Sequence, residues 1–140
     1  MDNNIRRDII LSHYQNPINK GLIESDDYIR YSKNSPSCID NIELMVKVNN
    51  GIVEDVRFDG EACAICTSAT SIMIETLIGK TLNEAKKIIN NYNQMINEED
   101  YDKELLEQLN VYDEIYKQPN RKNCALLPMD AMNYIIKEIK

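Results

Sequence analysis

Two runs of alternating side chains, residues 43–48 and 52–58, lie on either side of Asn49-Asn50-Gly51. An Asn-Gly pair between two such runs is a strong signal for a β-hairpin, because both residue types accept the positive φ angles of a tight turn. We therefore expect an antiparallel pair of strands here. In the second strand the alternation predicts two faces: Ile52, Glu54, Val56 and Phe58 on one, and Val53, Asp55 and Arg57 on the other.

Helical periodicity predicts much of the remaining structure. Apolar residues recur every three or four positions in residues 4–14, in residues 65–77 and from Leu82 onward. Residues 81–84 match a capping box, which marks the start of the third of these helices. A shorter helix is expected around residues 105–109.

The ends of the predicted elements are set by proline and polar clusters. Residues 118–123 are polar and predict a loop, and Pro128 fits the first turn of a final helix. This helix is therefore expected to begin between Cys124 and Leu127. With a further short strand at residues 26–33, the elements predict an α+β fold, in which a small antiparallel sheet of about three strands packs against several α-helices. The length of 140 residues fits a single domain over residues 1–140.

The composition excludes several classes of protein. A net charge of −7 argues against nucleic acid as a partner, because proteins that bind its backbone are usually basic. No stretch approaches 18 apolar residues, so we expect no membrane span. The first residues contain no long apolar core of a signal peptide, which predicts a cytoplasmic protein whose thiols stay reduced. Four cysteines in such a chain indicate metal or thiol chemistry, although free cysteines are also common as small buried apolar residues.

Three of the four cysteines have similar surroundings. Cys38, Cys63 and Cys124 each follow a polar turn at the predicted entrance to a helix or strand. In extended backbone Cys38 and Asp40 point to the same side, because side-chain direction alternates. Three thiolates and one carboxylate oxygen would suit a tetrahedral zinc site, although Asp40 equally fits an ordinary cap. The single histidine, His13, lies on a half-apolar helix and is interpreted as a packing or surface residue.

Cys63 and Cys66 form the chain's C-x-x-C sequence. A thiol at the start of a helix meets the positive end of the helix dipole, which favours the thiolate. Thioredoxin-like redox motifs have this placement, but they belong to a βαβ pattern, and here a hairpin precedes the motif. Alternatively, Cys66 replaces Asp40 as the fourth metal ligand. Both alternatives remain open from the residues alone.

Four signals, in order and at compatible spacing, resemble the U-type iron–sulfur scaffold proteins: the NifU N-terminal domain, IscU and, most closely, SufU. Residues 14–21 resemble the family's Asn-Pro-x-Asn-x-Gly segment, and residues 35–40 its Asn-Pro-x-Cys-Gly-Asp motif. Residues 54–63 resemble its strand leading into Gly-x-Gly-Cys, and Cys124 matches the third family cysteine. The resemblance extends through nearly the whole chain.

Further features of this resemblance favour the SufU type. Asn123 occupies the place where IscU-type proteins have a histidine, and residues 93–112 resemble the SufU insertion. Arg121 matches an arginine of SufU-type proteins. Two family glycines are replaced, by Ile39 and Ala62, and Cys66 stands where a small polar residue is usual.

The resemblance implies a role in iron–sulfur cluster assembly. It implies zinc held by four ligands, Cys38, Asp40, Cys63 and Cys124, with the role of Cys66 uncertain. A SufS-type cysteine desulfurase would be the partner, Cys38 the acceptor of persulfide sulfur, and Arg121 a contact of Asp40 or of the partner during a ligand swap. Such a protein would be a zinc-dependent sulfurtransferase. Alternatively, the same ligands hold iron or a nascent iron–sulfur cluster for apoproteins or a downstream scaffold, in which case the protein is a non-enzymatic scaffold. A third alternative is a structural zinc domain that only docks a partner.

Overall fold

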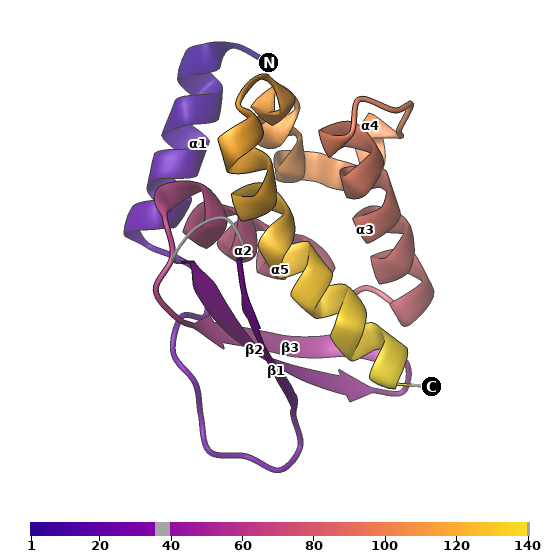
Figure 1. Cartoon of the computed structure of the whole chain (residues 1–140). Helices are drawn as coiled ribbons and strands as arrows, with labels where there is room; N and C mark the ends of the chain where they lie inside the picture. The colour runs from indigo at the N-terminus through magenta and orange to yellow at the C-terminus, as the bar shows by residue number, and fades with distance from the viewer. Residues whose placement is uncertain (36–39, 140) are drawn as a thin grey trace.

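The computed structural model describes residues 1–35 and 40–139. Its elements confirm the predicted α+β class, and a three-stranded antiparallel sheet in the order β1-β2-β3 forms one layer. Helices gather on one side of this sheet, as Figure 1 shows. In chain order the elements are α1 (Asn3–Gln15), β1 (Ile29–Asn34), β2 (Asn41–Asn49), β3 (Ile52–Asp59), α2 (Ala64–Leu77), α3 (Leu82–Ile96), α4 (Lys103–Leu106), the 3-10 helices η1 (Glu107–Tyr112) and η2 (Ile115–Lys117), and α5 (Pro119–Glu138).

The predicted hairpin is confirmed, and its turn has the expected geometry. Asn49 pairs with Ile52, which leaves Asn50 and Gly51 as the two turn residues, with φ angles of 54° and 75°. Positive φ at both positions is the requirement of a type I′ turn, whose twist matches that of the flanking strands.

The predicted alternation in the second strand is wrong near the turn. Val53 is fully buried, whereas Ile52 is 41% exposed. The cause is a register shift: Lys47 pairs with Asp55, but Val48 pairs with Val53. Glu54 is therefore an extra residue on β3, and such a bulge reverses which side chains face the core.

The outer edge of β3 is covered by two segments from elsewhere in the chain. Near its end, Gly21 donates its N–H to the carbonyl of Phe58 at 2.7 Å, and the N–H of Phe58 donates to Asn19 at 3.2 Å. Near its start, the N–H of Val53 donates to the carbonyl of Lys80 at 2.8 Å. An uncovered edge strand invites pairing with other chains, so both segments protect the sheet. The Asn-Pro-x-Asn-x-Gly segment thus has a structural role.

α5 is the helix that connects the layers. It packs on α2 and α3 as well as on β1 and β2, and in Figure 1 it runs diagonally across the sheet. Two buried tyrosines accompany it: Tyr92 donates to the carbonyl of Ala125 at 2.9 Å, and its ring meets that of Tyr112 edge-on with centroids 6.3 Å apart. These phenols combine large apolar contact with a satisfied hydroxyl group.

The predicted start of α5 is wrong. The helix begins at Pro119, so the expected loop at residues 118–123 is mostly helical, and Cys124 lies within the second turn. Pro119 takes the first-turn position, where a missing N–H costs little. Pro128, which the sequence placed there, lies inside the helix.

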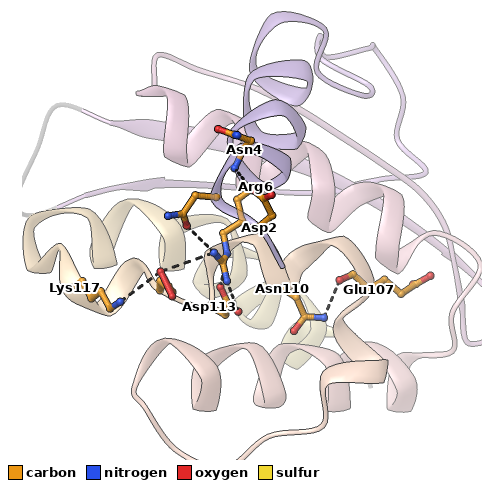
Figure 2. A network of polar contacts seen from close by, with 9 residues as sticks. Asp2, Asn4, Arg6, Glu107, Asn110, Asp113 and Lys117 are labelled. Atoms are coloured by element: carbon orange, nitrogen blue, oxygen red, sulfur yellow. Dashed lines mark hydrogen bonds and ion pairs between the residues drawn. The ribbon is translucent and has the colours of Figure 1, made fainter.

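An ion pair fastens α1 to the segment before α5. Arg6 donates from Nε to Asp113 Oδ1 at 2.9 Å and from a terminal nitrogen to Oδ2 at 3.2 Å, as Figure 2 shows. The hydrogen bond to Asp113 raises the pKa of Arg6 above its ordinary value, so the guanidinium stays charged. In the described part of the chain, no helix has the length and apolar character needed to span a bilayer.

Candidate metal centre

Three potential ligands meet at one end of the sheet. One carboxylate oxygen of Asp40 and the Sγ atoms of Cys63 and Cys124 lie within 4.8 Å of one another. Asp40 and Cys124 are buried, and Cys63 is partly exposed. The structure therefore brings together three of the four residues that the resemblance implies. The fourth, Cys38, lies outside the described residues.

The hairpin explains why Asp40 and Cys63 are neighbours. Glu43 pairs with Asp59, so the start of β2 and the end of β3 lie at the same end of the antiparallel pair. Across this end, the backbone N–H of Cys63 donates to Asp40 Oδ1 at 2.9 Å. This hydrogen bond fixes the carboxylate beside the cysteine that follows β3.

A close backbone contact holds the loop before Cys63. The N–H of Asn41 donates to the carbonyl of Glu61 at 2.8 Å, and Asn41 Oδ1 accepts the N–H of Glu61 at 3.3 Å. Gly60 directly precedes Glu61 and has a φ of 138°. A Cβ atom at this position would lie 2.2 Å from the carbonyl oxygen of Asn41, so only glycine fits. The motif contains this glycine, but no signal in the sequence indicates Asn41 as its partner.

Cys63 caps the start of α2. Its backbone is extended, and its Sγ accepts the N–H of Cys66 at 3.5 Å. A sulfur atom in this position takes up one N–H of the helix start, and the helix dipole favours negative charge on it. The predicted position of Cys63 at the start of a helix is therefore confirmed.

Cys66 occupies a different environment. It is fully buried within the hydrophobic core and lies outside the group formed by Asp40, Cys63 and Cys124.

Tyr112 lies in the same hydrophobic core as Cys66. It donates to Ser68 Oγ at 2.5 Å, while Ser68 donates to the carbonyl of Ile65 at 3.1 Å. Burial raises the pKa of Tyr112 far above its ordinary value, and the neighbouring Cys66 and Cys63 add to this effect. Tyr112 therefore remains a neutral hydrogen-bond donor.

Arg121 lies on α5, three residues before Cys124. This spacing puts both residues on the same face of the helix. The side chain of Arg121 is exposed, and it forms no ion pair with another residue of the described ranges. Its guanidinium is thus available to an approaching anion, which leaves the expected role of Arg121 as a proposal.

His13 has a structural environment, as the sequence indicated. Its Nδ1 lies 2.7 Å from Ser71 Oγ, and its Nε2 lies 3.1 Å from Gln108 Oε1. Ser71 also accepts the N–H of Ile18 at 2.8 Å. The histidine therefore joins α1, α2 and the segment that follows α4.

The donor set fits zinc. In a tetrahedral site the ligand atoms lie about 2.0–2.3 Å from zinc and therefore roughly 3.3–3.8 Å from one another. The three donor atoms, within 4.8 Å of one another, need only small rotations to reach such a geometry. Two thiolates and a carboxylate supply soft and hard ligands, and a fourth ligand would close the site.

The fold and the cluster together define the class of small α+β domains with a candidate cysteine–carboxylate metal centre. Within this class, residues 5–138 match the family described as NifU-like N terminal domain, and the chain belongs to that family.

Curated relatives agree with this assignment. The chain is 34% identical to the zinc-dependent sulfurtransferase SufU of Bacillus subtilis, over 90% of this chain and 85% of the relative. It is 30% identical to the iron–sulfur cluster assembly scaffold protein IscU of Thermotoga maritima, over 86% and 84% of the two chains. The resemblance that was expected from the sequence is confirmed.

A solved structure supports the fold. A putative iron–sulfur cluster assembly scaffold protein for the SUF system, from Fervidobacterium islandicum, superimposes with a TM-score of 0.87 at 27% identity, covering 91% of this chain and 93% of the other. The N-terminal part of a NifU-like protein from Brucella abortus shows the same fold, with a TM-score of 0.84 at 21% identity over 94% and 91% of the two chains.

Proposed function

We propose that the chain, acting as one domain over residues 1–140, is an iron–sulfur cluster assembly protein that holds zinc and accepts persulfide sulfur from a cysteine desulfurase. The observation that carries this proposal is the convergence of Asp40, Cys63 and Cys124. Zinc would be held by these three residues and Cys38, and when bound it keeps thiolates deprotonated at neutral pH.

The chemistry requires a nucleophilic thiolate that leaves the metal. In the proposed transfer, the Cys38 thiolate attacks the outer sulfur of the desulfurase persulfide. The S–S bond of the donor breaks, its cysteine leaves as a thiolate, and the sulfur remains on Cys38 as a new persulfide. Asp40 and Cys63 are held together by a hydrogen bond, so they remain in place while Cys38 is exchanged. Arg121, which is exposed on α5, would meet a carboxylate of the site or of the partner.

Two features favour a SufU-type acceptor. The relative with 34% identity carries that name, and Asn123 replaces the histidine of the IscU type directly before Cys124. A neutral imidazole would be an additional metal ligand, whereas an amide binds zinc poorly.

Metal analysis tests the site. We expect the reduced wild-type protein to bind one zinc ion, Asp40→Ala to lose it, and Cys66→Ser to retain it. Binding of no metal by the wild-type protein under reducing conditions would overturn the site.

Mass spectrometry tests the transfer. After incubation with a desulfurase and cysteine, the protein should gain the mass of a sulfur atom on Cys38, and Cys38→Ala should abolish desulfurase stimulation. Stimulation that survives in Cys38→Ala would contradict the assignment.

The second candidate is an IscU-type scaffold, because the relative at 30% identity has that name. Thiolates bind iron as well as zinc, so the donor set suits both. This candidate predicts that a cluster with visible absorption forms on the protein and is passed to an apoprotein. A structural zinc domain that only docks the desulfurase predicts a stable complex without any sulfur on its cysteines.

A further inference from the structure

Cys66 is the one cysteine in the described ranges that the proposed metal centre leaves out. It follows Cys63 by three residues at the start of α2 and is 0% exposed, whereas Cys63 is partly exposed. The Cys66 N–H donates to Cys63 Sγ at 3.5 Å, so the Cys63 sulfur lies over the first turn that carries Cys66. One accessible and one buried thiol at a helix start is the arrangement of a dithiol redox pair.

We propose that Cys63 and Cys66 form a reversible dithiol–disulfide couple that withdraws Cys63 from the metal centre when it is oxidised. The effect on metal binding rests on the proposed function, whereas the formation of the disulfide does not depend on it.

The local backbone allows the bond. Cys63 is the residue before α2, with φ of −66° and ψ of 172°, so its side chain is not held in the helical ladder. Side chains three positions apart meet on a helix surface, with Cβ atoms about 5–6 Å apart. A disulfide needs about 3.5–4.5 Å, and rotation of the extended Cys63 backbone can supply the difference.

The oxidant is a low-molecular-weight disulfide. The Cys63 thiolate attacks one of its sulfur atoms and forms a mixed disulfide, and the first small thiolate leaves. The Cys66 thiolate then attacks Cys63 Sγ, the second small thiolate leaves, and the Cys63–Cys66 bond forms. Two protein thiols are oxidised, and one disulfide is reduced to two thiols.

Oxidation of Cys63 weakens the proposed metal centre because it removes a negatively charged ligand. Oxidised Cys63 carries no thiolate charge, and only a thiolate binds zinc strongly. Asp40 and Cys124 lose the neighbour that completes their group, while the Asp40 hydrogen bond to the Cys63 N–H needs no thiol.

The test treats the reduced, metal-free full-length chain with oxidised glutathione and maps disulfides by peptide mass spectrometry. We expect a peptide that joins Cys63 to Cys66, a protein lighter by two hydrogens, and full reversal by dithiothreitol. Cys38→Ser should behave like the wild type, and Cys66→Ala should stop at the mixed disulfide with glutathione. If Cys66→Ala does not fold, Cys66→Val, which also fills the buried site with an apolar side chain, takes its place.

A second measurement follows zinc with a chromogenic chelator. With reduced glutathione present in excess, oxidised glutathione should release at least about tenfold more zinc from the wild type than from Cys66→Ala, because reduced glutathione reverses the mixed disulfide unless the second exchange converts it to the Cys63–Cys66 bond. Absence of the Cys63–Cys66 peptide, a bond from Cys63 to Cys38 or Cys124, or equal release from both proteins would overturn the inference. If the peptide forms but no cysteine ever acquires sulfur from a desulfurase, the proposed function fails and the redox couple remains.

Discussion

The two sides of the candidate metal centre are held in different ways. On the sheet side, Asp40 and Cys63 are joined by a hydrogen bond across the end of the β2–β3 hairpin, and Gly60 lies against Asn41. On the helix side, Cys124 is placed by the packing of α5 on the sheet and on α2 and α3. The sheet side depends on a few contacts with strict geometry, whereas the helix side depends on many apolar contacts. Single substitutions should therefore affect the two sides differently.

The largest effect is expected from Gly60→Ala. Its positive φ costs alanine about 1–2 kcal/mol, and the contact with the Asn41 carbonyl adds about 1–3 kcal/mol of strain, so the free energy of unfolding should fall by about 3 kcal/mol. Urea unfolding measures this loss, and zinc affinity should fall with it.

Gly21→Ala is the matched control for this comparison. Gly21 also has a positive φ, of 116°, but no atom lies within 4 Å of the position a Cβ would take. Its substitution should cost only about 1–2 kcal/mol and leave zinc binding unchanged. Equal losses in the two variants would show that the close contact with Asn41 contributes nothing.

Tyr92→Phe tests the helix side. It removes the hydrogen bond to the Ala125 carbonyl, next to Cys124, and keeps the buried ring. We expect a loss of about 1–2 kcal/mol in urea unfolding with zinc stoichiometry retained, because packing still places α5. Tyr112→Phe, which loses the bond to Ser68, is the parallel variant. Loss of zinc in Tyr92→Phe would mean that one hydrogen bond, and not packing, positions Cys124.

A smaller effect is expected away from the centre, at the start of α3. Thr81→Ala removes the side chain of the capping box and should cost about 1 kcal/mol. The Thr81 backbone N–H and hydroxyl hold the pKa of Glu84 below its ordinary value. This contribution is present above the ordinary pKa and is lost as the pH falls through the lowered one. In Thr81→Ala, an NMR titration should show the Glu84 pKa closer to its ordinary value. An unchanged pKa would show that the Thr81 hydroxyl does not contribute to lowering it.

The smallest effect is expected for Asn41→Ala. It removes only the 3.3 Å bond from the Glu61 N–H, while the shorter backbone bond between the same residues remains. About 0.5 kcal/mol should be lost in urea unfolding. A loss of unfolding free energy as large as that of Gly60→Ala would mean that the Asn41 side chain, and not the backbone bond, is the main restraint on the loop.

Local signals predicted the elements whose causes are local. The Asn50-Gly51 turn and the Thr81 capping box depend on residues at fixed, short spacing, and both appear as expected. The first residue of α5 and the side of the sheet on which Val53 lies were predicted wrongly. The presence of a proline does not show whether it lies in the first turn of a helix or inside it. The bulge at Glu54 arises from the pairing of β3 with β2, and the local sequence of β3 does not contain that information.

The sequence by itself determined the α+β class, the hairpin and the residue types of the candidate cysteine–carboxylate centre, because turn chemistry, periodicity and motif spacing depend on residues that are close together in the chain. Only the tertiary structure decided that Asp40, Cys63 and Cys124 meet, and that Cys66 turns into the core beside them. The physical reason is that antiparallel pairing and the packing of α5 bring together residues far apart in sequence, and their proximity is a property of the folded core.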